Sequence, residues 1–171
     1  MIKSTKGVLR VIAVAAVLAG ILAVATPALA AVDHYEVQVD GLACPFCAYG
    51  LEKKLKKLPG AANVQIELKT GWASFDVSSG VLLPESVRDA IRDAGFTPRD
   101  IRVTASGTVH GDGDELRLRV GSDQTLTLRG GEAFDTLRGL VKKGHRDVVV
   151  TGLIGRVDDA WQLSVSSAKQ R

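Results

Sequence analysis

The sequence predicts an α+β protein: a ferredoxin-like βαββαβ domain followed by a small β-rich module of the OB-like kind. Two observations predict the first part. Apolar residues alternate with polar ones over four short segments, and two segments between them repeat apolar residues at helical spacing. Their order over residues 33–104 is strand, helix, strand, strand, helix, strand, as in the split βαβ arrangement with its antiparallel sheet and two helices on one face. Residues 107–168 hold further alternating segments and one helical segment, which predict a second, β-rich unit.

The first strand and the first helix flank the only two cysteines of the chain. Tyr35, Val37 and Val39 alternate with polar residues, which predicts a strand with one buried face. After the cysteine loop, leucines at helical spacing predict a helix that ends at the Pro-Gly pair of residues 59–60. The opposite side of this helix carries lysines, so the helix is amphipathic.

A β-hairpin and a second helix follow. Apolar residues alternate over 64–68 and again over 73–77, with a tight Lys-Thr-Gly turn between the two runs. The second helix begins at Pro84, and Gly95 lies where a helix C-cap glycine is expected. A last strand is predicted around residues 101–103.

The second unit is separated from the first by residues 104–107, Thr-Ala-Ser-Gly, which predict a short link. Beyond it the patterns predict strands over 116–120 and 126–128, a helix within 131–144, and strands within 146–157 and 160–165. Several short strands and one helix suggest a small barrel of the OB type or a related β-rich module.

Residues 1–30 have the pattern of a secretory signal peptide. Three basic residues precede an apolar run over 11–25, and small residues follow up to Ala30. We expect cleavage after Ala30 and a periplasmic or otherwise exported protein. Contact with a membrane is expected only through this segment, if cleavage fails.

The charge balance argues against a nucleic-acid partner. The chain has 22 basic and 19 acidic residues, but three bases and no acids lie in residues 1–30. The exported chain therefore has 22 − 3 = 19 basic against 19 acidic residues, a net charge of zero. No general positive charge remains to attract a phosphate backbone.

The loop DGLACPFCAYG contains Cys44 and Cys47, and this spacing suits a metal clamp, a disulfide-exchange centre or a structural clasp. A helix N-terminus beside the pair stabilises thiolates. Two soft sulfurs suit Cu(I) or Hg(II), whereas a structural zinc site needs four ligands. Met1 is the only methionine, so after cleavage the two thiols are the whole set of soft ligands.

Three alternatives stay open on the residues alone. C-P-F-C resembles the motif of thiol oxidants, but thioredoxin-like folds need a crossover where this chain predicts a hairpin, and Pro45 suits the first helical position. An inert disulfide would close a loop too short to stabilise the fold much. In the third alternative the chain is a non-catalytic interaction module whose function lies in the second unit.

Several motifs together resemble the heavy-metal-associated domain family, which includes copper chaperones, metal domains of P-type ATPases and a periplasmic mercury-binding protein. They are the G-x-x-C-x-x-C loop, L-x-x-L-P-G, the T-G hairpin and A-I-x-x-A-G-F, over residues 34–103. The resemblance implies that Cys44 and Cys47 are the metal ligands. It also implies that Leu42 packs under the loop and that Phe96 partly covers the thiolates.

The resemblance further implies a non-enzymatic carrier that captures Cu(I) or Hg(II) and passes it on by ligand exchange. The expected partner is a metal-transporting membrane protein or another thiol metal carrier. Phe46, Lys53, Lys54 and Lys57 lie beside the pair and form a candidate partner surface, although a solvated helix face has the same composition.

Overall fold

The structure is a computed structural model that describes residues 31–78, 83–121 and 124–171. The predicted signal peptide, residues 1–30, lies outside the described residues. The elements are β1 (Ala31–Asp40), α2 (Pro45–Leu55), β2 (Ala61–Glu67), β3 (Trp72–Val77), α3 (Pro84–Asp93), β4 (Thr97–His110), β5 (Leu116–Val120), β6 (Gln124–Arg129), α4 (Phe134–Lys142), β7 (Asp147–Val157) and β8 (Ala160–Gln170).

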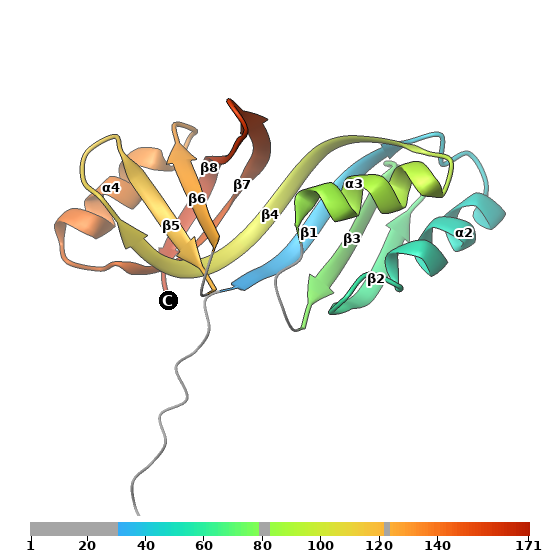
Figure 1. Cartoon of the computed structure of the whole chain (residues 1–171), viewed down its shortest axis with the longest axis horizontal. Helices are drawn as coiled ribbons and strands as arrows, with labels where there is room; N and C mark the ends of the chain where they lie inside the picture. The colour runs from blue at the N-terminus through green and yellow to red at the C-terminus, as the bar shows by residue number, and fades with distance from the viewer. Residues whose placement is uncertain (1–30, 79–82, 122–123) are drawn as a thin grey trace, which may run out of the picture.

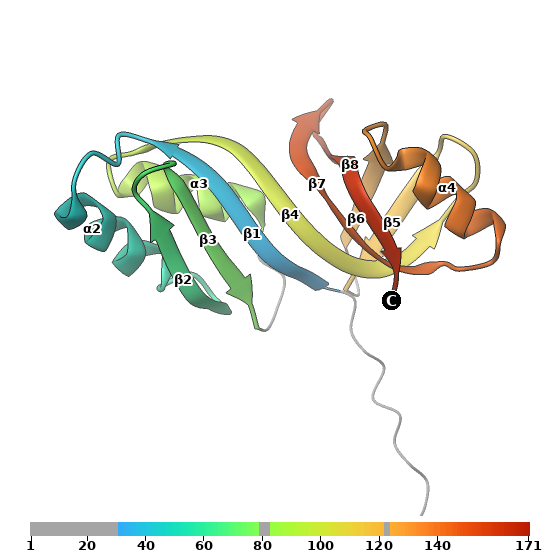
Figure 2. The same cartoon turned by 180° about the vertical axis from the view of Figure 1, so that it is seen from behind.

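The first six elements form a ferredoxin-like lobe. Its strands lie in the order β2-β3-β1-β4, and each neighbouring pair is antiparallel. Figures 1 and 2 show α2 and α3 together on one face of this sheet, with the other face open. The predicted βαββαβ arrangement is therefore confirmed, including the β2–β3 hairpin in place of a thioredoxin-type crossover.

Alternation along β1 explains why this sheet has one apolar face. Tyr35, Val37 and Val39 are buried, and Tyr35 stacks on Phe75 of β3 with ring centroids 5.3 Å apart. The helices cover this face with their own apolar residues, among them Leu51 of α2. Each strand and helix thus removes its apolar side from water against its neighbours.

The link predicted at residues 104–107 is instead the middle of β4. Thr104, Ala105 and Ser106 pair with β1 on one side and with β7 on the other. The prediction was wrong because small and hydroxyl residues, which are common in loops, here belong to a continuous strand. Here they lie where backbone is paired on both edges, and Gly107 lies so near the Arg119 carbonyl that a Cβ would be 2.3 Å from it.

The second lobe is a five-stranded barrel that shares β4 with the first. Strands β4, β5 and β6 are antiparallel neighbours, β6 pairs in parallel with β8, and β8 pairs with β7. The β4–β7 pairing over Arg102–Thr108 closes the ring. In Figure 1, β4 runs from one lobe into the other, and α4 lies at the barrel's outer end.

Two ion pairs lie near the junction of the lobes. Arg156 Nη1 on β7 donates to Glu85 Oε1 on α3 at 2.6 Å, and Arg102 Nη1 on β4 donates to Glu36 Oε2 on β1 at 3.0 Å. The Arg102 guanidinium also lies 5.3 Å from the centre of the Trp72 ring. The lobes are therefore joined by a shared strand and by a contact between side chains of α3 and β7.

Candidate metal centre

The cysteine loop connects β1 to α2 at one end of the ferredoxin-like lobe (Figure 1). Gly41 makes the turn out of β1 with φ of 95°, a conformation that favours glycine, and the Ala43 amide donates to the Gly41 carbonyl. Cys44 is then the N-cap of α2, and Pro45 follows at the start of the helix. The predicted position of the cysteines, one before the helix and one in its first turn, is confirmed.

Cys44 and Cys47 are joined by a disulfide in this structure, with their Cα atoms 5.2 Å apart. The Cys47 backbone amide also donates to Cys44 Sγ at 3.2 Å. Both side chains are partly exposed, so a small reagent or ion can reach the sulfurs. The fold therefore holds the two sulfurs together at an accessible helix N-terminus, where backbone N–H groups favour negative charge.

Two apolar side chains lie in or next to the cysteine loop. Leu42 is 9% exposed and belongs to the core. Phe96 follows Gly95 at the end of α3 and packs against the core. Its ring lies beside Gly41, where an added Cβ would meet Phe96 Cδ1 at 3.5 Å. Phe96 thus neighbours the turn into the cysteine loop.

Within residues 31–78, 83–121 and 124–171, no group of three or more His, Cys, Asp or Glu side chains is placed to hold a metal ion. The two sulfurs stand as a pair without such neighbours. A two-sulfur site suits a soft ion of low coordination number and does not suit tetrahedral zinc or an oxygen-bound cation.

The exposed surface of α2 is aromatic near the cysteines and basic at the opposite end of the helix. Phe46 is 90% exposed, and Lys53, Lys54 and Lys57 are exposed along α2 and the turn after it. Tyr49, 65% exposed, was missed in the sequence. Its spacing of three from Phe46 places it on the same side of the helix, and that spacing was the available signal.

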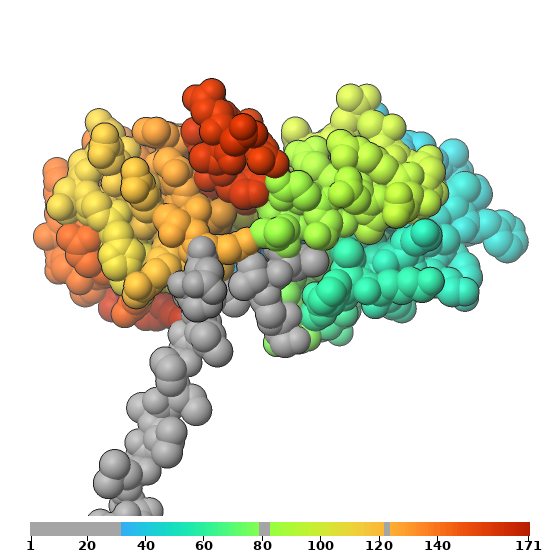
Figure 3. Space-filling view, viewed as in Figure 1, coloured from blue at the N-terminus to red at the C-terminus, as the bar shows by residue number. Residues whose placement is uncertain are grey.

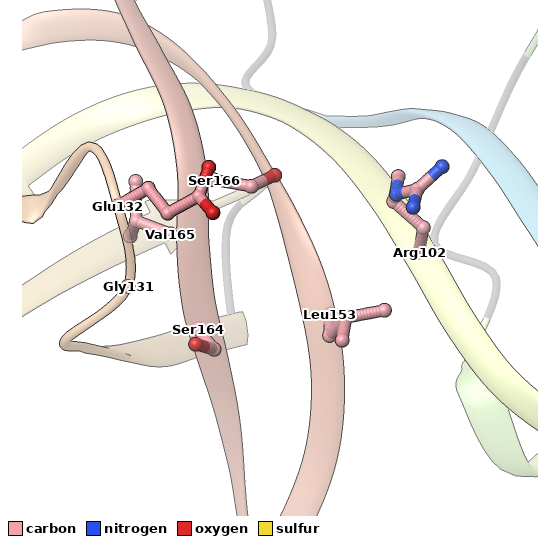
Figure 4. A pocket seen from close by; sticks show the side chains of 7 residues that line it. All are labelled: Arg102, Gly131, Glu132, Leu153, Ser164, Val165 and Ser166. Carbon is pink, nitrogen blue, oxygen red and sulfur yellow. The ribbon is translucent and has the colours of Figure 1, made fainter.

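Apart from the cysteine loop, the structure has a hollow of about 320 Å³ on the barrel. This hollow shares no lining residue with the loop. Figure 4 shows Glu132 and Arg102 at its opposite sides with Leu153 between them. The remaining lining residues are Gly131, Ser164, Val165 and Ser166. Arg102 is already held by Glu36 and Trp72, so this hollow offers no free charged group from β4.

Among the residues that the structure describes, no helix combines the length and the apolar character needed to cross a membrane.

A ferredoxin-like lobe with a cysteine pair at the N-terminus of its first helix defines a thiol-bearing α+β domain. Residues 36–97 match the model of the heavy-metal-associated domain family, so the chain carries a domain of this family. The match ends at the beginning of β4, and the other barrel strands lie outside it.

Two of the curated relatives are copper proteins by name. The chain is 31% identical over 87 residues to "Copper-transporting ATPase 2" of Rhizobium meliloti, covering 51% of this chain and 10% of the ATPase. It is 28% identical over 60 residues to "Copper chaperone CopZ" of Staphylococcus saprophyticus, covering 35% of this chain and 88% of the chaperone. The chain thus spans only a small part of the ATPase.

Among solved structures, oxidized MerP from Ralstonia metallidurans CH34 superposes with a TM-score of 0.38 at 22% identity. That alignment covers 40% of this chain and 96% of MerP. A structure titled "CopZ metallochaperone" superposes with a TM-score of 0.37 at 23% identity, covering 39% of this chain and 98% of that one.

Proposed function

We propose that this protein is an exported carrier that binds one soft metal ion, Cu(I) or Hg(II), between Cys44 and Cys47. The observation that carries the proposal is the position of the pair. Two sulfurs meet at an accessible helix N-terminus, inside a segment that matches a heavy-metal-associated domain. The copper proteins among its relatives favour Cu(I) as the cargo.

Metal binding requires the reduced pair. The disulfide takes up two electrons and two protons from a dithiol reductant, which becomes a disulfide itself, and the resulting thiols lose their protons when the ion binds. The amides of the first turn of α2 then face the thiolates and offset their charge. The ion is held by two strong soft ligands and stays open to a third.

Delivery follows by ligand exchange. A thiolate of the partner attacks the bound ion, a three-coordinate intermediate forms, and one sulfur of this chain leaves before the other. The partner is a metal-transporting membrane protein or another thiol carrier with an acidic surface. It would meet Phe46 and Tyr49 as apolar contacts, with Lys53, Lys54 and Lys57 giving charge complementarity.

We further assign the barrel to the OB type. Its strand order, β4-β5-β6-β8-β7, with β6 parallel to β8 and a helix between β6 and β7, supports this assignment. The basic and then apolar pattern of residues 1–30 supports export with cleavage after Ala30.

The test is a metal titration of the chain from Ala31 onward, reduced and free of oxygen, against a chromophoric Cu(I) competitor and separately with Hg(II). We expect one ion per chain, and we expect binding to be lost in both Cys44→Ser and Cys47→Ser. The oxidised wild-type chain is the matched control, because it differs only by the disulfide and should not bind.

The rival function is thiol–disulfide exchange with protein substrates. An insulin-reduction assay on the same preparations separates the two. A chain that reduces insulin rapidly and leaves the competitor's Cu(I) untouched contradicts the carrier.

A further inference from the structure

Three arginines lie on the outer face of the barrel, and none of them forms an ion pair with another residue that the structure describes. The burial pattern of β5 alternates, so Leu116, Leu118 and Val120 face the core while Arg117 and Arg119 face solvent. On β6, Arg129 is exposed in the same way. Figure 3 shows the yellow and orange segments of β5 and β6 on an open surface of the barrel lobe. We call Arg117, Arg119 and Arg129 the arginine face.

The arginines elsewhere in the fold are mostly neutralised. Those held by carboxylates are Arg92, Arg99, Arg102, Arg138, Arg146 and Arg156. Within the described part of the chain, the arginine face has no such ion pair. Side chains two apart on a strand are about 7 Å apart and diagonal neighbours on adjacent strands are similarly close, so these like charges repel one another.

The neighbours in register are polar. Arg117 lies between His110 on β4 and Thr127 on β6, and Arg119 lies opposite Thr125. Further along, Thr127 is beside Gln162 and Arg129 is beside Ser164 of β8. These positions supply hydrogen-bond donors, and His110 is the one aromatic ring among them. None of them carries an aliphatic side chain.

This composition selects the kind of partner. A protein interface has an apolar or aromatic core, and single-stranded nucleic acid is held by stacking on successive aromatic side chains. The arginine face has no apolar core, and its only neighbouring ring in register is the single imidazole of His110. Guanidinium groups pair bidentately with phosphate oxygens, and hydroxyl and amide donors extend such contacts. A layer of anionic lipid headgroups is a partner that the arginine face can recognise through charge and hydrogen bonds alone.

We propose that the arginine face docks the protein peripherally on an anionic phospholipid surface. This contact is separate from the metal site, and it differs from the sequence-based expectation that membrane contact needs an uncleaved signal peptide. It would hold the barrel against the bilayer, and the ferredoxin-like lobe would be tethered there through the shared strand β4.

The test is co-sedimentation of the metal-free chain from Ala31 onward with vesicles. All described strands and helices lie in this part, and it lacks the basic and apolar residues 1–30, which would bind vesicles by themselves. One vesicle set contains phosphatidylglycerol and phosphatidylcholine, the other phosphatidylcholine alone. We expect binding to the anionic vesicles only, and we expect added salt to release the protein.

Replacing all three arginines by Gln should lower partitioning on the order of 100-fold, since each basic residue near an anionic surface contributes on the order of fivefold. Glu115 is an exposed acid just before β5, so neutralising it should change vesicle partitioning in the opposite direction. Glu115→Gln should raise partitioning by on the order of fivefold.

The matched control removes the same charge elsewhere on the barrel, by Gln at the exposed Lys142, Lys143 and Lys169. An equal loss in this control, or no wild-type binding to anionic vesicles at low salt, overturns the proposal. So does retention of the chain by soluble polyphosphate or single-stranded DNA without vesicle binding. Metal titration of the same proteins measures the carrier function separately, so a failure of membrane docking can be distinguished from a failure of metal binding.

Discussion

Tyr35 is the residue whose ionisation couples most clearly to folding. Its ring is fully buried and stacked on Phe75. Burial, and secondly the negative charge of Glu85, raises the pKa of the Tyr35 phenol well above its ordinary value. The folded protein therefore keeps this proton at pH values where an unfolded tyrosine loses it.

The expected consequence is a loss of stability at alkaline pH. The contribution of Tyr35 is fully present below the unfolded pKa of about 10, and it falls by up to about 1.4 kcal/mol per pH unit above it, until the folded pKa is reached. Urea unfolding across this range should therefore show a shallower loss in Tyr35→Phe than in wild type. Tyr49→Phe, at a 65% exposed position, is the control and should follow wild type. Identical alkaline slopes in all three proteins would contradict the prediction.

Strand β4 is the element on which the architecture depends. Its first part belongs to the ferredoxin-like sheet and its last part to the barrel, and between Arg102 and Ser106 both edges are paired. Where β4 enters the barrel, Gly107 lets β5 approach: a Cβ at this position would meet the Arg119 carbonyl oxygen at 2.3 Å and Leu118 Cδ1 at 3.1 Å.

Gly107→Ala should therefore destabilise the protein, by roughly 1–3 kcal/mol, because a backbone atom has to move. Gly50→Ala is a matched control within α2. An added Cβ meets nothing within 4 Å there, and alanine in a helix should stabilise by about 0.5–1 kcal/mol. Chemical unfolding of both variants measures the two signs. A Gly107→Ala protein as stable as wild type would contradict this prediction, because it would show that β5 moves away from the added Cβ without a loss of stability.

At the scale of the whole molecule, the two lobes share backbone as well as side-chain contacts. Unfolding either lobe removes one edge of β4 from its partner strand and exposes apolar residues of a single contiguous core. The Arg156–Glu85 pair adds a contact between β7 and α3. Loss of one lobe is therefore expected to weaken the other.

The two tryptophans report on this coupling, because Trp72 lies in β3 of the first lobe and Trp161 in β8 of the barrel. We expect the single-tryptophan proteins Trp72→Phe and Trp161→Phe to unfold in urea at fluorescence midpoints that each coincide with the circular dichroism midpoint of the same protein. In either variant, a fluorescence midpoint well separated from that value would mean that the lobes unfold independently.

Sequence patterns were sufficient to predict those elements whose structure depends only on residues close together in the chain. Alternation in β1 and helical spacing in α2 follow from one apolar face, and Gly95 has the positive φ of 87° expected after a helix end. The position of Cys44 and Cys47 could be predicted because the start of α2 is also marked by residues close to the pair. The limits of β4 did not follow, because Thr104–Gly107 is ordered by strands that begin far away along the chain.

The sequence by itself determined the ferredoxin-like order, the cysteine pair at a helix N-terminus and the resemblance to the heavy-metal-associated family, since each strand, helix and motif that they rest on is set by residues close together in the chain. The tertiary structure alone decided that β4 fuses the two lobes. It also placed Phe96 beside the turn at Gly41. Both features depend on which segments that are distant in the chain become neighbours. The hydrophobic pattern fixes which face of a strand is buried, and it does not specify which distant strand lies beside it.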